Sequence, residues 1–84
     1  MYLHLGGDTV INTDDIVGIF DLENTSISKH TRFYLTRVQK ENRVINVSYE
    51  LPKSYIITSE NGEERVYISQ LAPSTLLRRM NQII

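Results

Sequence analysis

The chain has 84 residues, of which 40 % are hydrophobic and 23 % charged, a composition typical of one globular domain and not of a disordered chain. It contains no cysteine, which excludes disulfide bridges, thiolate metal sites and cysteine nucleophiles. A formal net charge of −1 favours no class of partner, whereas the short length favours burial of surface in an oligomer, because a small core supports little stability.

The first quarter of the chain predicts three strands. Short β-prone runs over 2–5 and 9–12 flank Gly6-Gly7, a turn pair that accepts positive φ at both central positions and therefore predicts a tight hairpin. A turn follows over 12–15. The run 16–22 is rich in β-branched and aromatic residues and too short for a confident helix, so it predicts a buried strand.

A helix is predicted over 26–42, with possible N-caps at 24–26 and Asn42 as a left-handed residue that ends it. Residues placed 100° apart separate into two faces. The apolar face carries Ile27, Tyr34, Val38 and, more loosely, Leu35. The opposite face carries Lys29, Arg32, Lys40 and Arg43, flanked by His30, Phe33 and Arg37.

The second half predicts three more strands and a helix. Residues 43–50 alternate, with Ile45, Val47 and Tyr49 on one face, until Pro52 ends the strand. Runs over 55–59 and 65–69 surround the turn pair 61–62 and predict a second hairpin. A helix begins at Pro73, with an apolar face of Leu76, Leu77, Met80, Ile83 and Ile84. The predicted fold is a small α+β domain spanning 1–84, in the order βββ-α-βββ-α, with antiparallel hairpins and two helices.

The sequence contains no recognisable catalytic, cofactor or metal site. His4 and His30 belong to different elements and lack the spacing of metal ligands, and Asp14-Asp15 is typical of a solvated turn. No serine has an identifiable neighbouring base. We therefore expect a protein that binds a partner and is not an enzyme, with no cofactor.

The location expected from the sequence is the cytoplasm. No stretch approaches the roughly 20 apolar residues of a membrane span. The first residues also lack the basic and apolar segments of a signal peptide.

The charges along the chain are strongly polarised. Residues 1–26 contain five acids and no Lys or Arg, whereas residues 27–43 contain five cations and one acid. The basic helix face, with Phe33 among the cations, is a candidate surface for phosphates and bases. The alternative is a solvated outer face. A third possibility is that the acidic N-terminal third pairs with the basic helix of a neighbouring subunit.

The loop at Pro52-Lys53-Ser54 is a second candidate surface. A loop between two strands often carries function because the scaffold holds it in place. On local grounds, however, a simple strand-connecting turn with proline at its first corner is the favoured explanation of this loop. The five tyrosines are better explained by core or interface packing than by a cofactor stack.

Four segments resemble the RemA/RemB group of extracellular-matrix regulators from Firmicutes. They are Met1-Tyr2-Leu3-His4-Leu5-Gly6-Gly7-Asp8, Asp15-Ile16-Val17-Gly18-Ile19-Phe20-Asp21, Pro52-Lys53-Ser54-Tyr55-Ile56-Ile57-Thr58 and Ser74-Thr75-Leu76-Leu77-Arg78-Arg79. The resemblance implies a cytoplasmic regulator of biofilm matrix genes. For the RemA branch it also implies a DNA-binding ring of identical subunits, related in fold to LytTR-type domains.

The resemblance also implies a position for DNA contact. In the RemA branch the loop entering the fifth strand is rich in arginine. The matching residues here are Leu51-Pro52-Lys53-Ser54, where only Lys53 is cationic.

Together, the charge pattern and the resemblance predict an oligomeric regulator that binds DNA. The predicted DNA-contacting residues are Lys53, Lys29, Arg32, Arg37, Lys40 and Arg43. The alternative is an accessory factor that binds a protein, such as a RemA-like paralogue, and does not contact DNA itself.

Overall fold

A computed structural model describes residues 1–22 and 29–81, and it confirms a small α+β domain with two helices. The elements are β1 (Tyr2–Gly6), β2 (Thr9–Asn12), the short 3-10 helix η1 (Thr13–Asp15), β3 (Ile16–Asp21), α1 (Lys29–Lys40), β4 (Val44–Asn46), β5 (Ser54–Glu60), β6 (Glu63–Ser69) and α2 (Pro73–Asn81). Neither helix in the described ranges is long and apolar enough to cross a membrane.

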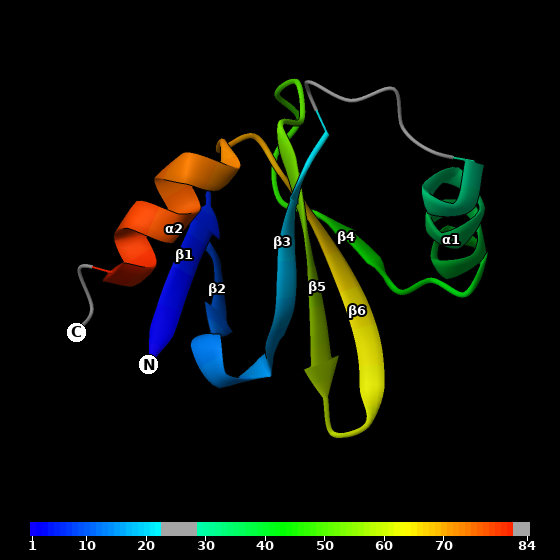
Figure 1. Ribbon diagram of the computed structural model, residues 1–84, viewed down its shortest axis with the longest axis horizontal. Helices are drawn as coiled ribbons and strands as arrows, with labels where there is room; N and C mark the ends of the chain where they lie inside the picture. The colour runs from blue at the N-terminus through cyan, green and yellow to red at the C-terminus, as the bar shows by residue number, and fades with distance from the viewer. Residues whose placement is uncertain (23–28, 82–84) are drawn as a thin grey trace.

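The described strands form two sheets (Figure 1). β1 and β2 pair as an antiparallel hairpin, and the other four form a sheet in the order β3-β5-β6-β4. β5 and β6 form the predicted antiparallel hairpin. β3 pairs with the other side of β5, also in antiparallel orientation. β4 runs parallel to β6, a pairing that the sequence analysis did not predict. The chain between them contains the whole of β5, so it can cross the sheet and return in the same direction.

The predicted turns are confirmed by their backbone angles. Gly6 and Gly7 have φ of 114° and 52°, and Asn61 and Gly62 have φ of 54° and 82°. Asn42 has φ of 58° just after α1, as expected of a residue that ends a helix. These positions favour glycine and asparagine because other side chains are strained at positive φ.

The domain has three layers (Figure 1). α1 covers one face of the four-stranded sheet, while the β1-β2 hairpin and α2 cover the other. The first core lies on the hairpin side and is built from Leu3, Leu5, Ile11, Ile56, Tyr67 and Leu76. The second core lies under α1 and is built from Val38, Tyr55 and Val66, with partly buried neighbours. Strand alternation sends Ile56 to one core and Tyr55 to the other.

The expected strand over 43–50 was too long. Strand β4 ends at Asn46, and the Ser48 hydroxyl then accepts a hydrogen bond from the Glu50 N–H at 3.0 Å, which forms a turn. Tyr49 is therefore fully exposed and not buried beside Val47. Of the predicted helix residues, 26–28 and 83–84 lie outside the described residues.

Candidate nucleic-acid interface

α1 is attached to the sheet by the face that the periodicity predicted. Val38 is fully buried against Tyr55 and Val66, and Tyr34 and Leu35 are half-buried beside it. The separation of faces follows from the 3.6-residue repeat, which brings positions 34, 35 and 38 to one side. This packing determines which α1 side chains point away from the sheet.

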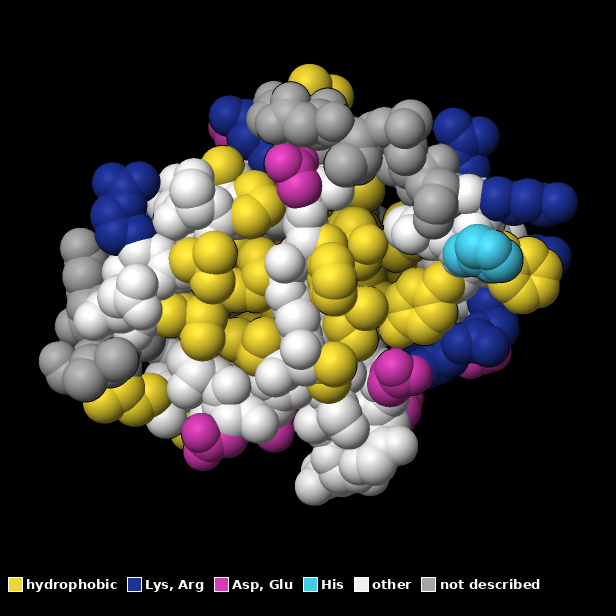
Figure 2. Space-filling view, in the orientation of Figure 1, with side chains coloured by type: hydrophobic (Ala, Val, Ile, Leu, Met, Phe, Trp, Pro, Cys, Tyr) yellow, Lys and Arg dark blue, Asp and Glu magenta, His cyan; other side chains and the backbone are white. Residues whose placement is uncertain are grey.

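The outward face of α1 is basic. Four of the five cations predicted in this region lie on α1, and all four are exposed: Lys29, Arg32, Arg37 and Lys40. α1 contains no acidic residue, so no carboxylate on the helix itself neutralises them. Figure 2 shows these positive charges gathered at the α1 end of the molecule. Phe33 lies among them with 73 % of its surface exposed.

Part of this charge also stabilises the helix. Arg37 and Lys40 occupy the last turn, where cations interact favourably with the negative end of the helix dipole. The Arg37 guanidinium lies 5.5 Å from the centre of the Tyr34 ring, in a cation–π contact. Burial raises the pKa of the Tyr34 hydroxyl, and the nearby Glu64 carboxylate raises it further. Lys29 and Arg32, at the start of the helix, gain no such dipole stabilisation.

Arg43 was wrongly placed on the exposed face. It follows the end of α1, so the helical spacing used to assign it does not apply. Its side chain is only 15 % exposed and forms an ion pair with Glu41. Its Nη1 also donates a hydrogen bond to the Glu64 carbonyl oxygen at 2.9 Å. Arg43 therefore ties the segment after α1 to β6.

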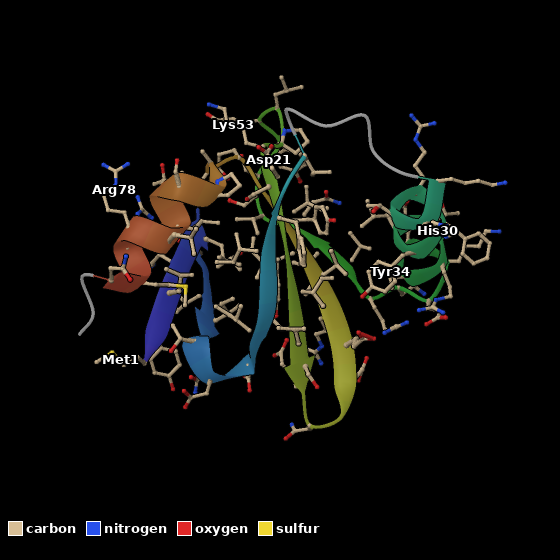
Figure 3. All side chains as sticks on the ribbon, in the orientation of Figure 1. Met1, Asp21, His30, Tyr34, Lys53 and Arg78 are labelled. Carbon is tan, nitrogen blue, oxygen red and sulfur yellow. The ribbon has the colours of Figure 1, made fainter. Side chains whose placement is uncertain are left out.

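Lys53 lies on a firmly held backbone between β4 and β5. Its N–H donates to the Ser69 carbonyl at 2.8 Å, and its own carbonyl accepts from the Leu22 N–H at 2.9 Å. The side chain is exposed at one end of the sheet, near the end of β3 and away from α1 (Figure 3). The structure therefore separates Lys53 from the basic face of α1 and does not join them in one patch.

A third cationic group, on α2, was not among the predicted site residues. Arg78 and Arg79 are exposed, as expected from the apolar spacing that turns Leu76 inward. Figure 3 places Arg78 on the opposite side of the molecule from α1. The +3 charge of residues 65–84 was the sequence signal for this group.

The described residues contain no cluster of three or more His, Cys, Asp or Glu side chains able to hold a metal ion. Two shallow, mostly apolar hollows of about 280 and 230 Å³ flank α1. The larger is bordered by Val17, Tyr34, Tyr55 and Glu64, among others. Both are below the usual size of a small-molecule site.

Comparison with known proteins agrees with the resemblance seen in the sequence. Residues 2–80 match the family model RemA-like, described as "Extracellular matrix regulatory protein A-like". The chain is 38 % identical over 79 residues to "Extracellular matrix regulatory protein B" of Bacillus subtilis (strain 168), which covers 94 % of this chain and 89 % of that protein. The chain belongs to the RemA-like family of extracellular matrix regulatory proteins.

Proposed function

We propose that this protein is a cytoplasmic, oligomeric regulator of extracellular-matrix genes that binds DNA through the basic face of α1. Membership of the RemA-like family supports the regulatory role. The observation that carries the DNA contact is the exposed, acid-free row of cations on α1. On this proposal the protein acts by binding and catalyses no reaction.

The shape of α1 suits contact with a phosphate backbone. Twelve residues span about 18 Å, so its cations can meet several phosphates along one strand. Arginine and lysine side chains are long enough to reach the phosphate backbone of DNA without insertion of the helix into a groove. The exposed Phe33 ring provides an apolar surface for a sugar or base among these charges.

Lys53 is a second proposed contact. One lysine contributes only one phosphate contact per subunit, and it lies apart from α1. Repetition of both contacts around an oligomer strengthens DNA binding. Once one subunit is bound, its neighbours meet the same DNA at a high effective concentration. A ring of subunits therefore allows DNA binding even though each subunit carries few cations.

The proposal is tested by titrating a matrix-gene promoter fragment at several salt concentrations. Each lost phosphate contact lowers the slope of log K against log salt by about 0.9. The double substitution R32A/K40A is expected to weaken binding and to reduce the slope by about 2 per subunit engaged with DNA. The matched control is R78A/R79A, which removes two exposed arginines from the other side of the molecule.

The outcomes separate the surfaces. A loss in R32A/K40A with little change in R78A/R79A supports the α1 interface. Equal losses in both double variants refute α1 as the specific contact. Binding that ignores salt refutes a phosphate contact altogether.

The alternative function is that of an accessory factor that does not touch DNA. The observations favouring it are the net charge of −1 and the exposed apolar residues Tyr49 and Leu51 beside Lys53. Absence of a gel shift at low salt, together with co-elution with a RemA-like paralogue, would support this alternative.

A further inference from the structure

The loop between β4 and β5 exposes two large apolar side chains on a backbone that is held at both ends. The N–H groups of Val47 and Lys53 donate hydrogen bonds to carbonyls of β6 at 2.9 and 2.8 Å. The residues between them, 48–52, are called the apolar loop below. They include Tyr49, which is fully exposed, and Leu51, which is 80 % exposed. Apolar side chains presented on a fixed backbone are typical of an interaction site, because little order has to be gained on binding.

The larger of the two hollows beside α1, called the α1 hollow below, can receive an apolar side chain. It lies between α1, which contributes His30 and Tyr34, and the sheet, which contributes Val17, Tyr55 and Ile57. Figure 2 shows hydrophobic surface between the backbone of β3 and the histidine of α1 that Figure 3 labels as His30. The volume of the hollow is about 280 Å³. A cavity of about 150 Å³ holds benzene, so the α1 hollow has room for an aromatic side chain.

We infer that Tyr49 and Leu51 of the apolar loop dock into the α1 hollow of a second copy of this chain. The inference deepens the oligomeric part of the proposed function and rests on it. The loop and the hollow are different surfaces, so each copy inserts its loop into one neighbour and receives the loop of another. A contact between two different surfaces repeats from subunit to subunit and closes into a ring when the rotation allows it.

The position of the loop decides which of the two hollows receives it. Tyr49 is fully exposed, so it fills neither hollow of its own chain. The smaller hollow is bordered by Pro52 of the apolar loop itself. A partner loop docked there would lie beside the loop of the receiving copy, an arrangement that suits a closed two-fold pair. No residue of the apolar loop is among the described residues that line the α1 hollow, so docking there leaves the receiving loop available for the next copy.

The charges of the loop and of the hollow are complementary on the α1 side. Glu50 is exposed between the two apolar side chains of the loop. α1 contains no acidic residue, and the Arg37 guanidinium lies 5.5 Å from the centre of the Tyr34 ring, which lines the hollow. The Glu64 carboxylate belongs to the sheet side of the hollow. Glu50 of the docked loop is therefore directed toward α1, where it meets a cation, and away from Glu64.

Docking in the α1 hollow is compatible with DNA contact by α1. The hollow opens beside Tyr34, on the side of the helix that faces the sheet. Arg32 precedes Tyr34 by two residues and is therefore about 200° around the helix from it. The docked loop leaves Arg32 on the opposite side of α1, exposed to solvent and able to meet a phosphate.

The first test truncates the loop and measures the mass of the assembly by light scattering over a range of concentrations. Y49A/L51A is expected to raise the dissociation constant of self-association at least about tenfold, because buried aromatic side chains dominate such contacts. Both side chains are exposed in the single chain, so the circular dichroism spectrum should not change. Y2A/L77A is the matched control, because it truncates an exposed tyrosine and an exposed leucine outside the loop and the hollow.

The second test mixes two defective variants. V17W/H30W fills the α1 hollow from its sheet side and its α1 side, at two exposed positions, and should weaken self-association as the loop variant does. In a mixture, the intact loop of V17W/H30W can enter the intact hollow of Y49A/L51A. The expected product is a one-to-one complex of twice the 9.7 kDa subunit mass that adds no further subunits. A two-fold contact gives no such rescue, because each of its halves needs both surfaces.

The possible results separate this inference from the proposed function. A monomeric wild-type chain, unchanged self-association of Y49A/L51A, equal losses in Y2A/L77A, or failure of the two defective variants to combine each overturns the docking. Loss of co-elution with a RemA-like paralogue in Y49A/L51A, with self-association unchanged, also overturns it and assigns the loop to that partner. If the wild-type chain still binds DNA with a steep salt dependence, the DNA-binding proposal survives. Loop-dependent assembly that ignores DNA supports the docking and refutes DNA binding.

Discussion

Ser69 is predicted to be a main link between the β1-β2 hairpin and the four-stranded sheet. Its buried hydroxyl donates a hydrogen bond to the Leu5 carbonyl at 2.6 Å and accepts one from the Leu71 N–H at 3.0 Å. The Leu5 bond joins residues 64 positions apart in the chain. S69A leaves the Leu5 carbonyl and the Leu71 N–H without this partner. Each lost hydrogen bond lowers the unfolding free energy by about 1–2 kcal/mol, so the total decrease is about 2–4 kcal/mol.

Two other serines provide a graded comparison. The buried Ser54 hydroxyl makes one bond, to the Leu71 carbonyl at 2.8 Å, so S54A should lose about 1–2 kcal/mol. Ser59 is exposed on the same strand, and S59A should change stability by less than about 0.5 kcal/mol.

The assay is urea denaturation followed by circular dichroism, at one fixed protomer concentration because association adds to apparent stability. For a domain of this size, S69A should lower the melting temperature by roughly 10 °C or more. A shift of the urea midpoint with an unchanged slope is expected. If S69A and S59A denature together, the hydroxyl does not hold the hairpin to the sheet and the reasoning fails.

Three further predictions concern single positions. R43A should lower the unfolding free energy by about 1–3 kcal/mol, because the Arg43 guanidinium bonds within the protein. For the same reason, R43A should leave the slope of log K for DNA binding against log salt unchanged. A reduced slope would show that Arg43 contacts DNA. G6A should destabilise more than G62A in the same denaturation assay, because an added Cβ at Gly6 lies 2.6 Å from the Gln70 amide, whereas at Gly62 it meets nothing within 4 Å. Both glycines have positive φ, so equal losses would mean that backbone strain alone decides. Burial raises the pKa of the Tyr67 hydroxyl above its ordinary value of 10.0, and the hydrogen bond to the Glu60 carboxylate raises it further. The neutral hydroxyl therefore contributes its full stability to the folded state below pH 10, and this contribution is lost as the pH rises above 10. Y67F should therefore lose less stability than the wild type between pH 9 and about 11, and parallel pH profiles would contradict the assignment.

The sequence predicted the elements whose causes are local. The turn pairs Gly6-Gly7 and Asn61-Gly62 connect hairpins because few residues tolerate their backbone angles. The burial of Val38 and the exposure of Arg32 follow from helical periodicity, which is a property of neighbouring residues. Four of the six predicted contact residues therefore lie together on α1, as expected.

The tertiary structure alone decided the rest. Arg43 turned inward because the helix ended before it, and its carbonyl and guanidinium found partners on β6. Lys53 and the basic face of α1 are separate surfaces. After α1 the chain forms β4 at one edge of the sheet and then passes β6 to reach the start of β5, beside Lys53. The parallel pairing of β4 and the place of β3 at the end of the strand order depend on which strands meet over long sequence distances. Local patterns do not encode those meetings, because a strand with the same alternation of side chains can pair in either direction and on either side.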